Sequence, residues 1–131
     1  MAEKKQKQAQ VSGVYQTNDQ VVTVHVPVIF FKEEETTIAY CPALNVYGYG
    51  TDEEQAEESF KIALGEFFRY SLNKKTLIPE LEALGWVVKR KKKFIPPVFS
   101  TLLDKNPEFK TIFDTRNFTK FDTGISIPIP A

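Results

Sequence analysis

The first third of the chain has the alternating apolar and polar pattern of β-strands. Residues 11–26 hold two β-rich runs around Asn18-Asp19, a pair that tolerates the left-handed backbone of a hairpin turn. Residues 28–31 and 36–41 flank a charged run that no core accepts unpaired. These four runs predict two consecutive hairpins.

Proline and glycine interrupt this pattern of predicted strands. Pro27 lacks a backbone N–H, so it marks an edge, a bulge or the break before a new strand. A short strand over residues 45–50 contains Gly48 and Gly50, which we interpret as backbone devices for a bulge or turn. They form no phosphate loop, because the third glycine and the lysine of such loops are missing.

A long helix follows this strand. Thr51 with Glu54, or Asp52 with Gln55, has the spacing of a capping box, and the acidic first turn complements the helix dipole. Beyond it, small and apolar residues recur at spacings of three and four: Ala56, Phe60, Ala63, Leu64, Phe67, Phe68 and Ser71. The pattern predicts a helix to about Asn73 that packs this stripe on the sheet.

A shorter helix and another strand complete the predicted domain. Pro79 suits the first turn of a helix that runs to Leu84, with Gly85 as its left-handed cap. Residues 86–94 are interpreted as the last strand of the sheet.

The aromatic tail is too short to form a core of its own. Asn106 and Pro107 predict the start of a short helix that carries Phe109, and the isoleucines at 125, 127 and 129 alternate as in a strand. The tail must therefore cover the first domain or a second chain.

Length, composition and charge narrow the class of protein. We expect a disordered arm at 1–10, an α/β domain with an extra N-terminal hairpin at 11–94, and a C-terminal extension at 95–131. Seventeen lysines and arginines balance seventeen aspartates and glutamates, so no global field attracts nucleic acid or membrane. Without a signal peptide or a run of about twenty apolar residues, the expected location is cytoplasmic.

Candidate catalytic chemistry is sparse. Cys41 and His25 are single, so they predict neither a disulfide nor a four-ligand zinc site. We interpret Cys41 as a small buried filler and His25 as a surface or hydrogen-bonded residue. The carboxylates of Glu33, Glu34 and Glu35 follow one another on a turn, which scatters them instead of converging them on metal ions. The sequence predicts no enzyme, cofactor, metal or small-molecule substrate.

One concentrated charge run stands at residues 89–93. In a strand, Lys89, Arg90 and Lys91 alternate across both faces, so we interpret the run as an edge that discourages pairing between chains. Contact with nucleic acid or an acidic partner is the alternative, because phosphate contacts need only clustered cations.

Two further pairs are candidates for contact with a partner protein. Tyr47 and Tyr49 project to one face of their strand, and tyrosine is favoured at interfaces, although core packing explains them equally well. Glu53 and Glu57 lie on the acidic face of the helix. This face is either exposed to solvent without a binding role or a surface for a basic partner.

The order of these elements resembles the HicB family of antitoxins over about residues 26–92. Pro27 before an apolar strand, Pro42-Ala43-Leu44, Gly50 and Glu54-Gln55-Ala56 match motifs of that family in order and spacing. The chain departs from the family at Asn45-Val46-Tyr47, where Pro-Gly-Cys is common, and in its front hairpin and tail.

The resemblance implies both a fold and a function. The fold would be α+β, a partial RNase H-like domain with a bent antiparallel sheet of three to five strands under one long helix. The function would be to occlude a HicA-like RNA-cleaving toxin, often as a homo-oligomer. No helices follow the last predicted strand, so a conventional DNA-binding module is not evident, although other modes of DNA binding stay open. A solitary self-assembling structural or regulatory domain, or an autorepressor, is the alternative.

Overall fold

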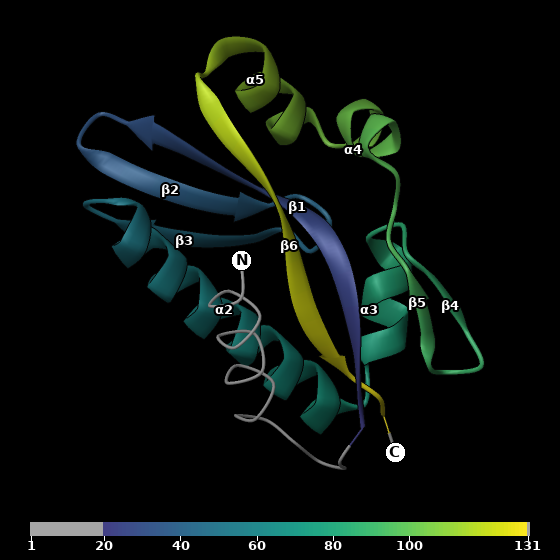
Figure 1. The fold of residues 1–131 in the computed structure, drawn as a ribbon. Coiled ribbons are helices and arrows are strands. Elements are labelled where there is room, and N and C mark those ends of the chain that lie inside the picture. Colours follow the sequence, from purple (N-terminus) through teal and green to yellow (C-terminus); the bar gives the residue numbers. More distant parts are fainter. Residues whose placement is uncertain (1–19, 131) are drawn as a thin grey trace.

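A four-stranded antiparallel sheet organises the chain, and the computed structural model describes residues 20–130 (Figure 1). Its strands are β1 (Val21–Glu33), β2 (Thr36–Cys41), β3 (Val46–Gly50) and β6 (Phe118–Pro128), in the spatial order β3-β2-β1-β6. One long helix packs on this sheet, so the predicted α+β class is confirmed.

The long helix α2 (Glu53–Lys74) begins as its sequence predicts. The Asp52 carboxylate accepts a hydrogen bond from the backbone N–H of Gln55 at 2.8 Å, and the Gln55 side-chain oxygen accepts one from the N–H of Thr51 at 3.0 Å. The predicted stripe faces the sheet, with Phe60, Leu64 and Phe68 fully buried. The helix ends one residue later than predicted, before Lys75, whose φ of 59° closes it in the left-handed conformation.

Gly48 and Gly50 correct the interpretation of a bulge or turn. The register of β3 with β2 is continuous from Val46 to Gly50, so no residue is inserted. A Cβ at Gly48 would overlap the backbone of α2 at Ala56 and Phe60. The glycines therefore let the helix lie directly on the strand.

Pro27 interrupts no strand. β1 runs through it without a bulge, and Pro27 pairs only with Asp122 of β6, because the pairing with β2 begins at Ile29. Of the three predicted positions for this proline, the edge is the one found, and the separate strands at 20–26 and 28–31 are one strand. The predicted partner strand at 11–17 and the turn at Asn18-Asp19 lie outside the described residues, as does the predicted arm at 1–10.

The tail packs on the core and contributes to the sheet. β6 pairs with β1 over eleven consecutive positions, from Val21↔Pro128 to Phe31↔Phe118, so the strand predicted at its end starts much earlier. Before it, α5 (Pro107–Thr115) begins at Asn106 as predicted, and α4 (Phe99–Lys105) was not predicted. Phe109 of α5 is fully buried against Tyr40, with ring centroids 6.2 Å apart.

The predicted last strand is wrong. After α3 (Leu77–Ala83) and Gly85, whose φ of +99° is the expected left-handed one, the chain forms a separate hairpin. Its strands are β4 (Val87–Lys89) and β5 (Lys93–Ile95), and they form a two-stranded sheet apart from the main one. The basic run covers its turn and the two strand ends beside it, at the far right of Figure 1.

Candidate partner-binding site

Six carboxylates gather at one end of the main sheet. The β1–β2 turn, the last residue of β3 and the first turn of α2 meet there, because Thr36 pairs with Glu33 and Thr37 pairs with Gly50. We call this region the acidic end and define it by six residues: Glu33, Glu34, Glu35, Asp52, Glu53 and Glu54. All six are exposed, which leaves their charge available to a partner.

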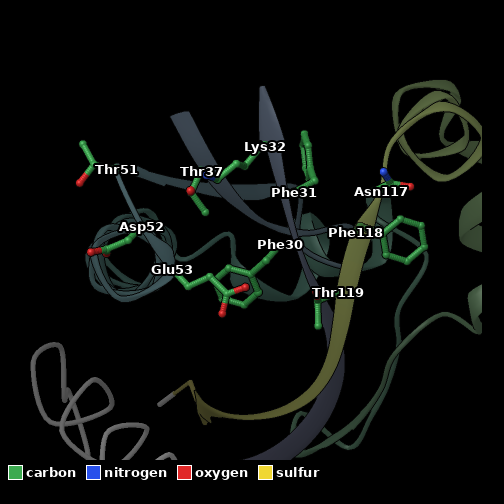
Figure 2. A pocket seen from close by; sticks show the side chains of 10 residues that line it. All are labelled: Phe30, Phe31, Lys32, Thr37, Thr51, Asp52, Glu53, Asn117, Phe118 and Thr119. Atoms are coloured by element: carbon green, nitrogen blue, oxygen red, sulfur yellow. The ribbon is translucent and has the colours of Figure 1, made fainter. Parts of the chain in front are cut away.

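A groove of about 610 Å³ opens on the helix-covered side of this end. Figure 2 shows Asp52 and Glu53 at the start of α2 on one side, Thr119 of β6 on the other, and Phe30 of β1 between them. The groove thus combines carboxylates with an aromatic floor.

Thr37 adds an unusual group to this groove. The residue is 3% exposed and lines the groove, and its hydroxyl oxygen is buried without a hydrogen-bond partner. A buried hydroxyl without a partner costs about 1–3 kcal/mol.

A second groove, of about 530 Å³, lies on the opposite side of the β1–β2 turn. It is lined by Glu33, Glu34, Ile38, Tyr49 and Arg116, among others. Arg116 forms an ion pair with Glu33, with 2.7 Å between Nη2 and Oε2, and this pair offsets one negative charge of the acidic end.

Three stacked tyrosines lead to this second groove. The rings of Tyr47 and Tyr49 are parallel, with centroids 6.1 Å apart, and Tyr40 stacks on Tyr47 at 4.3 Å. The Asn106 amide donates to the Tyr40 hydroxyl at 2.8 Å, which in turn donates to the Asn45 side-chain oxygen at 3.1 Å. The inner end of the stack is therefore fixed to α5, and the outer end, Tyr49, is 55% exposed.

Burial keeps the hydroxyls of Tyr40 and Tyr47 and the thiol of Cys41 neutral. Burial raises the pKa of Tyr47, and the neighbouring Glu108 carboxylate raises it further, although no hydrogen bond of good geometry reaches the Tyr47 hydroxyl. Burial also raises the pKa of Tyr40, and it raises the pKa of the Cys41 thiol to about 12. Cys41 is fully buried, as predicted, so it offers no thiolate to chemistry.

The structure separates the four residues predicted to contact a partner. Tyr47 and Tyr49 share a face of β3, as expected, but this face is opposite α2, and Tyr47 is partly covered. Glu53 lines the first groove, across the sheet from Tyr49. Glu57 lies outside both grooves and pairs with the buried Lys61, at 3.4 Å from Oε2 to Nζ.

Sequence reasoning missed Thr37 and Arg116. Thr37 resembles any strand threonine, and only its position beside Gly50 under the start of α2 isolates its hydroxyl. Arg116 belongs to the C-terminal extension at 95–131, and the sequence did not predict which part of the domain this extension contacts. Glu34 and Glu35 form an exposed turn, as predicted, and Glu33 is the last residue of β1.

The remaining candidates for chemistry are the single histidine and possible metal ligands. His25 is exposed on β1, where it faces Gly124 of β6. Within residues 20–130, no cluster of three or more His, Cys, Asp or Glu side chains is placed to hold a metal ion. No helix in the same range is both long and apolar enough to cross a lipid bilayer.

Lys89, Arg90 and Lys91 correct the prediction of cations alternating across a strand. Arg90 and Lys91 occupy the turn between β4 and β5, and Lys89 stands directly opposite Lys93. The cations are therefore gathered and not dispersed.

Comparisons of the chain with protein-family models, with curated proteins and with solved structures found no match.

Proposed function

We propose that this chain is a non-catalytic, antitoxin-like protein that binds a small basic HicA-like toxin through its acidic end and covers the toxin's active surface. The observation that carries the proposal is the acidic end, with its two flanking grooves and the exposed Tyr49. The order of motifs from Pro27 to Ala56, which resembles HicB antitoxins, supports it independently. As an antitoxin, the chain would act in the cytoplasm.

Opposite charges would guide the toxin toward the acidic end. Six carboxylates are offset locally by Lys32 and Arg116, and Arg116 already pairs with Glu33. A ribonuclease that binds RNA needs a cationic surface, and such a surface is attracted to a cluster of carboxylates. Complementary charge of this kind accelerates association and fixes orientation more than it adds affinity.

Contacts at Tyr49 and in the first groove would supply most of the affinity for the toxin. Tyr49 presents an aromatic ring that its stack with Tyr47 holds in place, and pre-ordered aromatic anchors are frequent hot spots. In the first groove, a lysine or arginine side chain of the toxin would lie along Phe30 and reach the carboxylates of Asp52 and Glu53.

The decisive experiment first asks whether an adjacent gene encodes a small basic protein, and then co-expresses that protein with the full chain and purifies both. Calorimetric titration measures affinity, and cleavage of an RNA substrate measures neutralisation. We expect a complex in which cleavage stops. Tyr49→Ser with Glu53→Gln should weaken binding by about tenfold or more, mainly at low salt for the charge change.

The matched control changes the same residue types elsewhere. Tyr70 is 59% exposed on α2 and Glu82 is exposed on α3, so Tyr70→Ser with Glu82→Gln removes one tyrosine and one carboxylate outside the acidic end. Equal loss of affinity in both double variants would contradict the proposed surface. A chain that assembles only with itself and leaves cleavage untouched would favour a self-assembling domain.

A further inference from the structure

The β4–β5 hairpin ends in five consecutive exposed cations. We call residues 89–93, which are Lys89, Arg90, Lys91, Lys92 and Lys93, the basic tip. They include five of the chain's seventeen lysines and arginines. None of the five has an ion-pair partner within residues 20–130. A chain of zero net charge therefore carries one strongly positive projection (Figure 1).

The base of the hairpin is held firmly. Trp86 and Phe94 are almost fully buried, and the Trp86 indole N–H donates to the Ala43 carbonyl at 2.8 Å. β5 also lies against β1. The basic tip is consequently presented by an anchored support and not by a loose loop.

The tip is built at a conformational and electrostatic cost. Arg90 and Lys91 have φ values of 57° and 60°, and the Lys92 N–H closes the turn on the Lys89 carbonyl at 3.2 Å. Two successive residues with positive φ define a type I′ turn, which Asn-Gly forms far more readily than Arg-Lys. Lys89 directly opposes Lys93, and like charges in such a pair repel.

A polyanion would relieve the repulsion among these cations. A nucleic acid duplex carries one negative charge per about 1.7 Å of its axis, which matches a compact group of cations better than isolated carboxylates do. A two-stranded ribbon is also an element that the major groove of DNA admits. The cross-strand pair Val87 and Ile95 lies two positions before the pair Lys89 and Lys93, on the same face of the hairpin. Both apolar side chains are exposed, so they form an apolar surface next to the cations.

We infer that the basic tip binds double-stranded nucleic acid through its phosphodiester backbone. This inference is independent of the proposed toxin contact, because the tip and the acidic end are formed by different elements. It also reverses the interpretation of the run as a mere guard against strand pairing, which assumed that the side chains alternate across a strand.

The test separates charge from folding. Arg90→Asn with Lys91→Gly places the preferred residues in the turn while it removes two cations, so the hairpin should stay intact. Fluorescence anisotropy with a 20-base-pair DNA duplex, and in parallel an RNA duplex, measures binding of the full chain at several salt concentrations. With five phosphate contacts, log K should fall against log salt with a slope of about −4.5, reduced to about −2.7 in the variant.

A second double variant is the control. Lys74 and Lys105 are exposed lysines on α2 and α4, and Lys74→Gln with Lys105→Gln removes the same charge away from the tip. We expect this control to keep the wild-type slope and the tip variant to lose about tenfold or more in affinity at low salt. Preference for DNA over RNA would place the ribbon in a major groove, and equal binding would indicate backbone contact alone. Binding to neither duplex, or equal loss in both variants, would overturn the inference.

Discussion

The acidic end and the basic tip are opposite in charge, and they also differ in how they are built. The acidic end is composite, because its carboxylates come from the β1–β2 turn and from the start of α2, which meet only through the pairing of β2 with β3. The basic tip is a single run of residues at the end of one hairpin. A chain of zero net charge thus has two regions of opposite charge, and we propose a different partner for each. The net charge of the chain predicts neither region.

The same difference separates their sensitivity to damage. The acidic end depends on α2 lying directly on β3, so any change that lifts the helix disperses its charges. The basic tip depends on a local anchor at Trp86 and Phe94. Mutations can therefore break one region and spare the other.

The largest effect is expected from Gly48→Ala. The new Cβ would overlap backbone atoms of Ala56 and Phe60, so helix and strand must move apart, at a cost of about 3 kcal/mol. Urea unfolding followed by circular dichroism measures the loss. Gly124→Ala is the control, because its Cβ would lie 3.3 Å from the His25 ring, an exposed side chain that can move. Equal stability of the two variants would contradict the role assigned to Gly48.

A smaller effect, confined to the β4–β5 hairpin, is expected from Trp86→Phe. The change leaves the buried Ala43 carbonyl without its donor, which costs about 1–3 kcal/mol. Hydrogen exchange should show faster opening of β4 and β5, while α2 and β3 keep their protection. If protection falls equally along the whole chain, the hairpin is not an independent support for the tip.

The smallest effect is expected from Arg116→Gln. The ion pair with Glu33 is more than one-third exposed on both side chains, so its loss should change the free energy of unfolding by at most about 1 kcal/mol. The acidic end gains one uncompensated charge, and association with a basic toxin should accelerate at low salt. Stopped-flow measurement of the association rate checks this, and an unchanged rate would argue against steering by the acidic end.

Local signals predicted much of the fold. The cap at Asp52, the stripe from Ala56 to Ser71 and the cap at Asn106 each depend on residues within a few positions of one another, and each was found. α4 was missed because the residue before its first turn, Val98, makes no side-chain capping bond. The basic turn was missed because Arg-Lys carries none of the glycine or asparagine signal that marks a type I′ turn.

The candidate site was less predictable than the fold. Glu53 and Tyr49 were identified by residue type, but their placement on opposite faces of the sheet follows from the register of β3 and the start of α2. Thr37 became distinctive only when its hydroxyl was buried without a partner. The contribution of Arg116 depends on an ion pair that spans the chain from β1 to the residue after α5.

By itself, the sequence determined where α2 and α5 begin, which residues alternate and where charge is concentrated, since these properties arise between near neighbours along the chain. The tertiary structure decided that β6 closes beside β1 and that two separate acidic segments meet at one end. Those outcomes depend on pairing between distant residues, such as Val22 with Ile127, and on the close contact that Gly48 permits. No window of neighbouring residues contains that information.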